Sequence, residues 1–223
     1  MARNLAYGMA LETLDIVLVD DNRGTQSVLR SIIAQMHIDR LRVYESAETA
    51  LQEIVNDPPS VLIAEWRMKP MSGYRLVRAL RDSSMTPLCF LPVLMVTATP
   101  TVTMVDKAFS IGANNILIMP LSPVVLRERL QWLCVDPREF VLNGDRYVLD
   151  GIEDALESRI RSNAVEAMLR RKHSMGNALA RRAERAQDLV DRIVTGDMDP
   201  DGMPPNALPP ENTATDWNGW TME

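Results

Sequence analysis

Short runs of consecutive apolar residues alternate along the chain with stretches in which apolar residues recur every three or four positions. A continuous apolar run is typical of a strand buried on both faces of a parallel sheet, and the second spacing is typical of an amphipathic helix. The pattern predicts strands at residues 15–20, 41–44, 61–64, 91–96 and 115–119. It predicts helices at 47–55, 74–81, 101–111 and 124–133, and one more that carries Val28, Leu29, Ile32, Ile33 and Met36. This alternation predicts an α/β fold, a doubly wound five-stranded parallel sheet.

The pattern changes after residue 135. Residues 136–150 form a connector, in which Asn143-Gly144-Asp145 predicts the turn of a small hairpin. Residues 151–194 are rich in Ala, Leu, Arg and Glu and predict an α-helical extension with a break near Gly176. The apolar stripes of this extension are narrow and rich in alanine. They therefore suit packing against another copy of the chain, against the preceding domain or against a different protein.

The two ends of the chain carry weaker signals. Residues 1–12 fit either a short helix or a frayed end. Residues 196–223 contain five prolines and six acidic residues, which predicts a disordered tail. Trp217 and Trp220 in this tail are either a docking motif for a partner or side chains packed loosely on the protein's own surface. The predicted units are thus residues 1–12, 13–135, 136–150, 151–195 and 196–223.

Composition limits the class of protein. At 223 residues and 46% hydrophobic, the chain is long enough for one domain of roughly 100 to 150 residues and a smaller extension. Cys89 and Cys134 lack metal-ligand spacing and are too few for a disulfide framework, so free thiols in the cytoplasm are expected. No stretch approaches the roughly 20 apolar residues that span a bilayer, so we expect a soluble protein without a membrane partner.

The net charge of −6 comes entirely from the tail, because residues 197–223 hold six acidic residues and no basic one. Acidic and basic residues balance over residues 1–135 and again over 136–196. Sequence-independent nucleic-acid binding needs a basic footprint, which no segment provides. The basic cluster Arg170-Arg171-Lys172-His173 keeps open a lesser alternative, a transcription regulator that binds DNA through residues 151–194.

Several polar side chains lie where the predicted strands end. Asp20 and Asp21 close the first strand, Glu65 follows the third and Thr97 follows the fourth. The carboxyl ends of parallel strands meet at one edge of the sheet, where open α/β folds place their ligands. We therefore expect these groups to form one acidic site.

The motifs VDDN, EWRMKPMSG, VTA and IMP, in this order and spacing, resemble the receiver domain of bacterial response regulators over about residues 13–135. The resemblance implies the flavodoxin-like or CheY-like sheet and a cytoplasmic role in two-component phosphorelay signalling. It implies that Asp20 and Asp21 bind Mg²⁺ and that the residue at position 65 is the phosphoacceptor. It also implies a phosphate-sensing hydroxyl at Thr97 and a lysine at position 119, before Pro120.

Three positions depart from this family pattern. Glu65 stands in place of the aspartate, and its extra methylene moves the carboxylate toward the phosphoryl position, which spoils the in-line geometry. Met119 stands in place of the lysine and supplies no positive charge for a transferred phosphate. Ile116 stands where many relatives carry a switching aromatic residue, so Thr97 lacks its usual partner. Lys69-Pro70 also departs from the commoner order, in which proline directly follows methionine.

These departures predict a degenerate receiver without enzymatic activity, which acts through contacts with signalling proteins such as a histidine kinase or a downstream effector. Homo-oligomers formed by the C-terminal helices are a further expectation. No cofactor is required, although Asp20, Asp21 and Glu65 offer hard oxygen ligands that suit Mg²⁺ or Ca²⁺. An acidic cluster without a metal is the alternative. The alternative function is a phosphorelay regulator phosphorylated at Asp20 or Asp21.

Overall fold

The computed structural model describes residues 2–152, 154–156 and 178–195. Within these residues, five parallel strands form one sheet in the order β2-β1-β3-β4-β5. The doubly wound sheet expected from the sequence is therefore confirmed. The strands are β1 (Asp15–Val19), β2 (Arg40–Tyr44), β3 (Val61–Glu65), β4 (Val93–Thr97) and β5 (Asn115–Ile118).

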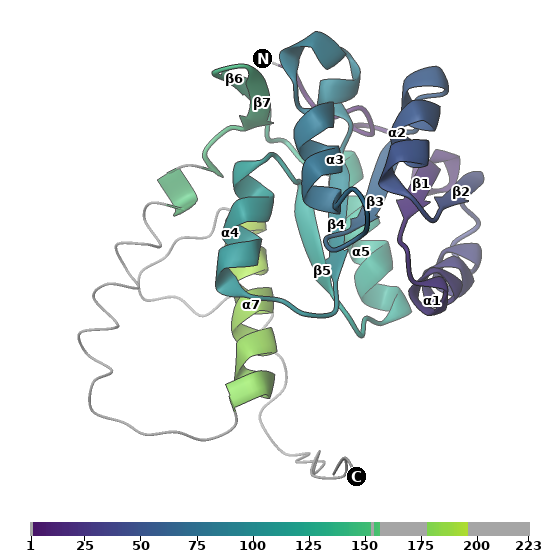
Figure 1. Cartoon of the computed structure of the whole chain (residues 1–223), viewed down its shortest axis with the longest axis vertical. Helices are drawn as coiled ribbons and strands as arrows, with labels where there is room; N and C mark the ends of the chain where they lie inside the picture. The colour runs from purple at the N-terminus through teal and green to yellow at the C-terminus, as the bar shows by residue number, and fades with distance from the viewer. Residues whose placement is uncertain (1, 153, 157–177, 196–223) are drawn as a thin grey trace.

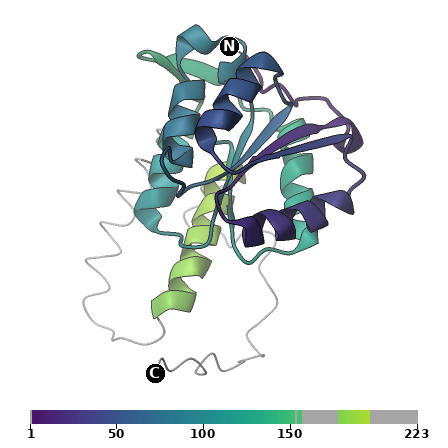
Figure 2. The same cartoon turned by 45° about the vertical axis from the view of Figure 1, so that its right-hand side comes forward.

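Helices cover both faces of the sheet (Figure 1, Figure 2). One buried cluster joins α2 (Ala47–Asn56), α3 (Gly73–Leu80) and α4 (Val102–Ser110) to one face. The other joins α1 (Arg23–Ala34) and α5 (Pro123–Val135) to the opposite face. Short 3-10 helices lie at Leu11–Thr13 (η1), Ser83–Met85 (η2) and Leu88–Phe90 (η3).

Side-chain caps fix where the helices begin. The residue before each of these α-helices accepts hydrogen bonds from amides of the first turn, which otherwise lack a partner. These capping residues are Asn22, Ser46, Ser72, Thr101 and Ser122.

The sequence pattern failed at one position of α1. Val28, predicted on the apolar face, is 47% exposed. Gln26 is buried instead, because its side-chain amide donates to the backbone carbonyl of Asp20. Hydrophobic periodicity does not detect a polar residue that is buried by a specific hydrogen bond.

The predicted hairpin is present as β6 (Phe140–Asn143) and β7 (Arg146–Leu149). The N-terminal segment holds it from one side, because the Phe140 amide donates to the carbonyl of Ala2. Asn4 and Gly8 bond to carbonyls at the end of α5. Residues 2–12 are therefore not a frayed end: they form turns and enter the short 3-10 helix η1, packed against the hairpin and α5.

The last described helix, α7 (Ala178–Thr195), lies beside α4 and against β5 (Figure 1). Its buried residues join the same apolar cluster as α2, α3 and α4; they are Ala186, Leu189, Val190, Ile193 and Val194. Of the three predicted surfaces for this helix, the structure uses the chain's own sheet domain. The predicted break at Gly176 lies outside the described residues, and no helix in the described ranges is long and apolar enough to cross a membrane.

Candidate functional site

The strand register gathers the predicted site residues at the carboxyl edge of the sheet. Val19 pairs with Ala64, so Asp20 and Glu65 follow on neighbouring strands. Thr97 ends β4 opposite Ile118, and the next amide, that of Met119, donates to the Thr97 carbonyl. The site therefore lies at the point where the strand order reverses, between β1 and β3, and extends to β5.

Asp20 is the buried member of the acidic group and is only 1% exposed. Its Oδ1 accepts a 2.7 Å hydrogen bond from the Asn22 amide, whereas its Oδ2 is buried and has no partner. An unpartnered buried carboxylate oxygen costs free energy unless it is protonated or binds a cation. Asp20 is thus the carboxylate of this site that is open to a further ligand.

Asp21 and Glu65 are tied to the loop that follows β3. Asp21 is exposed, and its Oδ2 accepts a 3.2 Å hydrogen bond from the Lys69 amide. Glu65 is half-buried, and its Oε1 accepts a 3.1 Å hydrogen bond from the Arg67 amide. These two bonds hold the loop over the acidic group through backbone amides. In the described ranges, no ion pair joins any of the three carboxylates to a basic side chain.

The pKa values of Glu65 and Asp20 are raised because both acids are at least partly buried and no basic side chain pairs with them in the described ranges. Burial raises the pKa of Glu65 to about 7; the Arg67 amide opposes the rise, and the charges of Asp20 and Asp21 add to it. Burial also raises the pKa of Asp20, with a further contribution from Asp21. At neutral pH, Glu65 is therefore close to half protonated.

The positions beyond the carboxylates carry no charge. Thr97 is fully buried, and its Oγ1 accepts a 3.2 Å hydrogen bond from the Thr99 amide. Ile116 is fully buried in the apolar cluster beneath α4. Met119 is half-buried and packs against the cluster on the opposite face of the sheet. The site thus combines three acids with apolar surroundings.

The donor chemistry fits a hard divalent cation in part. The three carboxylates are oxygen ligands, and Asp20 Oδ2 lacks a partner. However, no group of three or more His, Cys, Asp or Glu side chains among the residues that the structure describes is arranged to hold a metal ion. The predicted set of Asp20, Asp21 and Glu65 is therefore not a ready-made three-ligand site.

Three residues that support the site were not predicted as site residues, although Asn22 and Gly73 lie in the motifs VDDN and EWRMKPMSG. Asn22 both caps α1 and donates its amide to Asp20. Gln26 donates to the Asp20 carbonyl at 2.6 Å. Gly73 lets α3 begin directly against the Glu65 carbonyl. The signal for Asn22 is its place immediately before a helical pattern, whereas Gln26 and Gly73 depend on tertiary contacts. Trp217 and Trp220 lie outside the described residues.

The raised pKa of Glu65 predicts a stability that falls with pH. The folded state holds the proton more tightly than the unfolded state, so stability is full at low pH and is lost as pH rises through about 7. Because the side chain is only partly buried, we expect the free energy of unfolding to fall by about 1.5 kcal/mol between about pH 5 and 8. Glu65→Gln should remove this fall. Urea denaturation over this range, in the presence of a chelator, measures it.

The exposed Glu12 provides the matched control, and Glu12→Gln should keep the wild-type slope. If the Glu65→Gln variant shows the same slope as the wild-type protein, then Glu65 does not titrate in this range. Replacing the chelator with millimolar Mg²⁺ should flatten the wild-type slope if the acidic group binds the cation.

Comparison with known proteins agrees with this geometry. A model of the response regulator receiver domain matches residues 16–131. Chemotaxis protein CheY1 of Helicobacter pylori is 26% identical over 119 residues, which are 53% of this chain and 94% of that protein. Chemotaxis protein CheY of Pseudomonas aeruginosa is 27% identical over 118 residues, again 53% and 94%.

Solved structures show the same fold. A crystal structure from Chloroflexus aurantiacus, described as a response regulator, is 28% identical and has a TM-score of 0.51, covering 55% of this chain and 98% of that one. The receiver domain of the sensor histidine kinase PA1611 from Pseudomonas aeruginosa, solved with a magnesium ion in its active-site cleft, has a TM-score of 0.50 at 20% identity, covering 54% and 98%. Because the receiver model matches more than half of the 223 residues, this chain belongs to the response regulator receiver family, whose members act in two-component signalling.

Proposed function

We propose that this chain is an atypical response regulator, which acts through protein contacts and is not phosphorylated at Glu65. The observation that carries the proposal is a group of three acids that, within the described ranges, forms no ion pair with a basic side chain. Burial and the neighbouring Asp20 and Asp21 raise the pKa of Glu65 to about 7. Adding a phosphoryl group here would bring more negative charge into a place that already resists the charge of one carboxylate.

The neighbouring side chains offer no compensation. Phosphoryl transfer depends on in-line positioning and on positive groups that stabilise the charge spread over the phosphoryl oxygens. Met119 stands where the receiver pattern has a lysine; it is uncharged and packs against an apolar cluster. Arg67 and Lys69 are exposed, and they meet Glu65 and Asp21 through backbone amides. The basic side chains of this loop therefore make no ion pair with the acids.

Phosphorylation at Asp20 or Asp21 is the weaker alternative. Asp20 is 1% exposed, so a phosphodonor has almost no access to its carboxylate. Asp21 is accessible, but its Oδ2 is engaged by the Lys69 amide. An attacking carboxylate needs both an accessible oxygen and a cation beside it, and neither residue combines the two.

We propose weak, millimolar Mg²⁺ binding rather than a resident metal. Asp20 would contribute its unpartnered Oδ2, and Asp21 and Glu65 would contribute the oxygens not bonded to the loop. When bound, the cation would neutralise the acids and so lower the pKa of Glu65. Asp21 and Glu65 also position the loop after β3, because they accept hydrogen bonds from the Lys69 and Arg67 amides.

The partners we propose are proteins of the same signalling pathway, a histidine kinase or a downstream effector, and we propose no enzymatic activity of the chain's own. DNA binding through residues 151–194 has little support, because the buried stripe of α7 packs on the receiver. The basic cluster at residues 170–173 lies outside the described part of the chain. Residues Trp217 and Trp220 stay a predicted docking motif.

Placing an aspartate at position 65 and a lysine at position 119, as in the receiver pattern, should restore phosphorylation at position 65. With a small acyl phosphate and Mg²⁺, we expect the wild-type chain to gain no phosphoryl mass. The double variant Glu65→Asp with Met119→Lys shortens the carboxylate and supplies a positive charge, so its modified fraction should be at least about tenfold above the detection limit of the measurement. Intact mass spectrometry measures the added group.

The single variants serve as controls and should each gain less than the double variant, because both losses act on the same step. A wild-type chain that becomes modified, and loses the modification on Asp21→Ala, would reverse the ranking in favour of the alternative. Modification that is lost only on Glu65→Gln would show that Glu65 itself accepts the phosphoryl group.

A further inference from the structure

The helix α7 occupies a face of the receiver formed by α4, β5 and α5, here called the edge face. β5 is the last strand of the sheet, with α4 packed on one side of the sheet and α5 on the other. α7 lies against β5 and α4 (Figure 2). Its Asp191 forms an ion pair with Arg129 of α5. All three elements of the edge face therefore meet the same helix.

The contact is mainly apolar. On α7, Ala186 and Val190 are fully buried, and Leu189 is 8% exposed. They belong to one cluster with Val105 of α4 and Ile116 of β5. Burial of a few aliphatic side chains stabilises such a contact, because each removes apolar surface from water.

One ion pair, between Arg129 and Asp191, fixes how α7 is aligned on the edge face. Arg129 is 18% exposed and donates to Asp191, which is 39% exposed and also accepts from Gln187 one turn earlier in α7. A basic group on the receiver thus faces an acid on the helix. This opposite-charge pair distinguishes the seated register of α7 from neighbouring ones.

We propose that α7 also docks on the edge face of a second copy, so that two chains pair by exchanging this helix. Every copy carries α7, which fits the face, and exchange remakes the same apolar contacts and the same ion pair. The 21 residues of segment 157–177 separate α7 from Leu156. Fully extended, they would reach about 70 Å, which is ample for a neighbouring molecule. The proposal rests on the seat of α7 and not on the chemistry of Glu65.

The chain's own α7 competes with that of the second copy. A tether of this length gives an effective concentration on the order of millimolar, so the wild-type chain should be monomeric at micromolar concentration. Exchange should become visible only when the internal contact is weakened and the contact between copies is kept.

Charge reversal in two full-length chains weakens the internal contact of each chain and keeps the contact between the two. One chain carries Arg129→Asp and the other carries Asp191→Arg, so within either chain the pair has like charges. In a mixed exchanged dimer, the two reversed positions would face each other with opposite charges, and the native Arg129 would face the native Asp191. Each reversal should weaken the internal contact about fivefold, which favours the mixed dimer about 25-fold relative to the wild-type chain.

Light scattering after size exclusion, at about 0.1 mM, should show each variant alone as a monomer and their mixture as a dimer of one chain of each kind. A chain that carries both reversals is the control; it should be folded and monomeric. If that control is folded and the mixture stays monomeric, the proposal is wrong. A mixed dimer that survives Leu189→Asp in both chains would also overturn it, because the contact would then not use α7.

Discussion

Gly73→Ala should destabilise the protein more than any other single methyl addition at a described glycine. The new Cβ would lie 2.1 Å from the carbonyl oxygen of Glu65 and 3.0 Å from Met95 Cε. The carbonyl is backbone at the end of β3, so no side-chain rotation relieves the overlap, and α3 must move away from the sheet. We expect a loss of about 3 kcal/mol, at the upper end for overpacking. Urea denaturation measures it.

The same substitution should also disturb the acidic site, because the displaced carbonyl belongs to Glu65. The pH dependence of stability assigned to Glu65 should therefore become weaker in Gly73→Ala. Gly144→Ala is the matched control: Gly144 has a φ of +63°, but no atom lies within 4 Å of its added Cβ. It should lose about 1 kcal/mol from backbone strain alone. If the Gly73→Ala chain were as stable as this control, α3 would be able to move away from the Glu65 carbonyl at little cost in free energy, and the prediction would be wrong.

Much of the fold was predictable because a parallel strand is buried on both faces. The run at residues 61–64 is apolar throughout, and its short length and the turn residues that follow it favour a buried strand. The acidic site was predictable for a related reason. Strand ends in a parallel sheet share one edge, so Asp20 and Glu65 had to be neighbours once the strand order was set.

The electrostatic state of the site was not predictable from the pattern. The sequence shows three acids and no lysine at position 119, but the rise in the pKa of Glu65 depends first on burial. Burial is set by how α3 and its loop pack over the end of β3. The surface on which α7 packs was also not predictable, because a narrow apolar stripe shows that a helix is covered but not by which surface.

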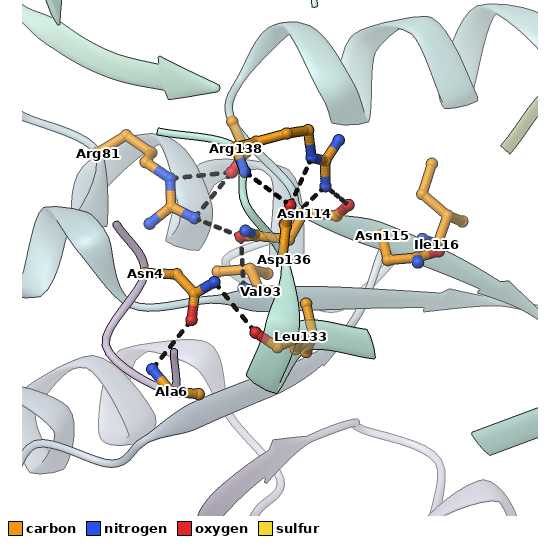
Figure 3. Close-up of polar contacts among 11 residues, drawn as sticks. Asn4, Ala6, Arg81, Val93, Asn114, Asn115, Ile116, Leu133, Asp136 and Arg138 are labelled. Atoms are coloured by element: carbon orange, nitrogen blue, oxygen red, sulfur yellow. Dashed lines mark hydrogen bonds and ion pairs between the residues drawn. The ribbon is translucent and has the colours of Figure 1, made fainter. Parts of the chain in front are cut away.

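Arg81 marks the clearest limit of sequence reasoning. It follows α3 in a stretch that reads as an ordinary amphipathic helix with exposed arginines, and yet it is fully buried. Its guanidinium donates to the side chain of Asn114 (Figure 3) and to the carbonyls of Gly112 and Cys89. Its central carbon lies 4.7 Å from the centroid of the Phe140 ring. These contacts join α3, the start of β5 and the hairpin, which no local pattern reveals.

The burial of this cation has two opposing effects on stability. Burial lowers the pKa of Arg81 to about 9, which leaves the side chain charged at neutral pH in a place that disfavours charge. In the described ranges, no carboxylate forms an ion pair with it. Removing the charge would relieve that cost. It would also remove the side-chain donors of two buried carbonyls, those of Gly112 and Cys89, and one of the two donors to Asn114 Oδ1, which keeps the Val93 amide.

We expect the loss of donors to dominate. Each unsatisfied buried acceptor costs about 1–3 kcal/mol, and the carbonyls of Gly112 and Cys89 belong to buried residues that bulk water does not reach. Arg81→Met, which keeps much of the apolar stem, should therefore reduce the free energy of unfolding by about 3 kcal/mol. Arg81→Lys should lose nearly as much, because a single ammonium cannot reproduce the planar fork that serves three acceptors.

Arg78, exposed on the same helix, gives the matched control, and Arg78→Met should change the free energy of unfolding by less than about 0.5 kcal/mol. Urea denaturation at neutral pH compares the three variants. If Arg81→Met were as stable as the wild-type chain, the cost of burying the charge would equal the value of its hydrogen bonds, and Arg81 would not anchor the hairpin. If only Arg81→Lys kept the wild-type stability, charge rather than fork geometry would hold Gly112 and Cys89 together.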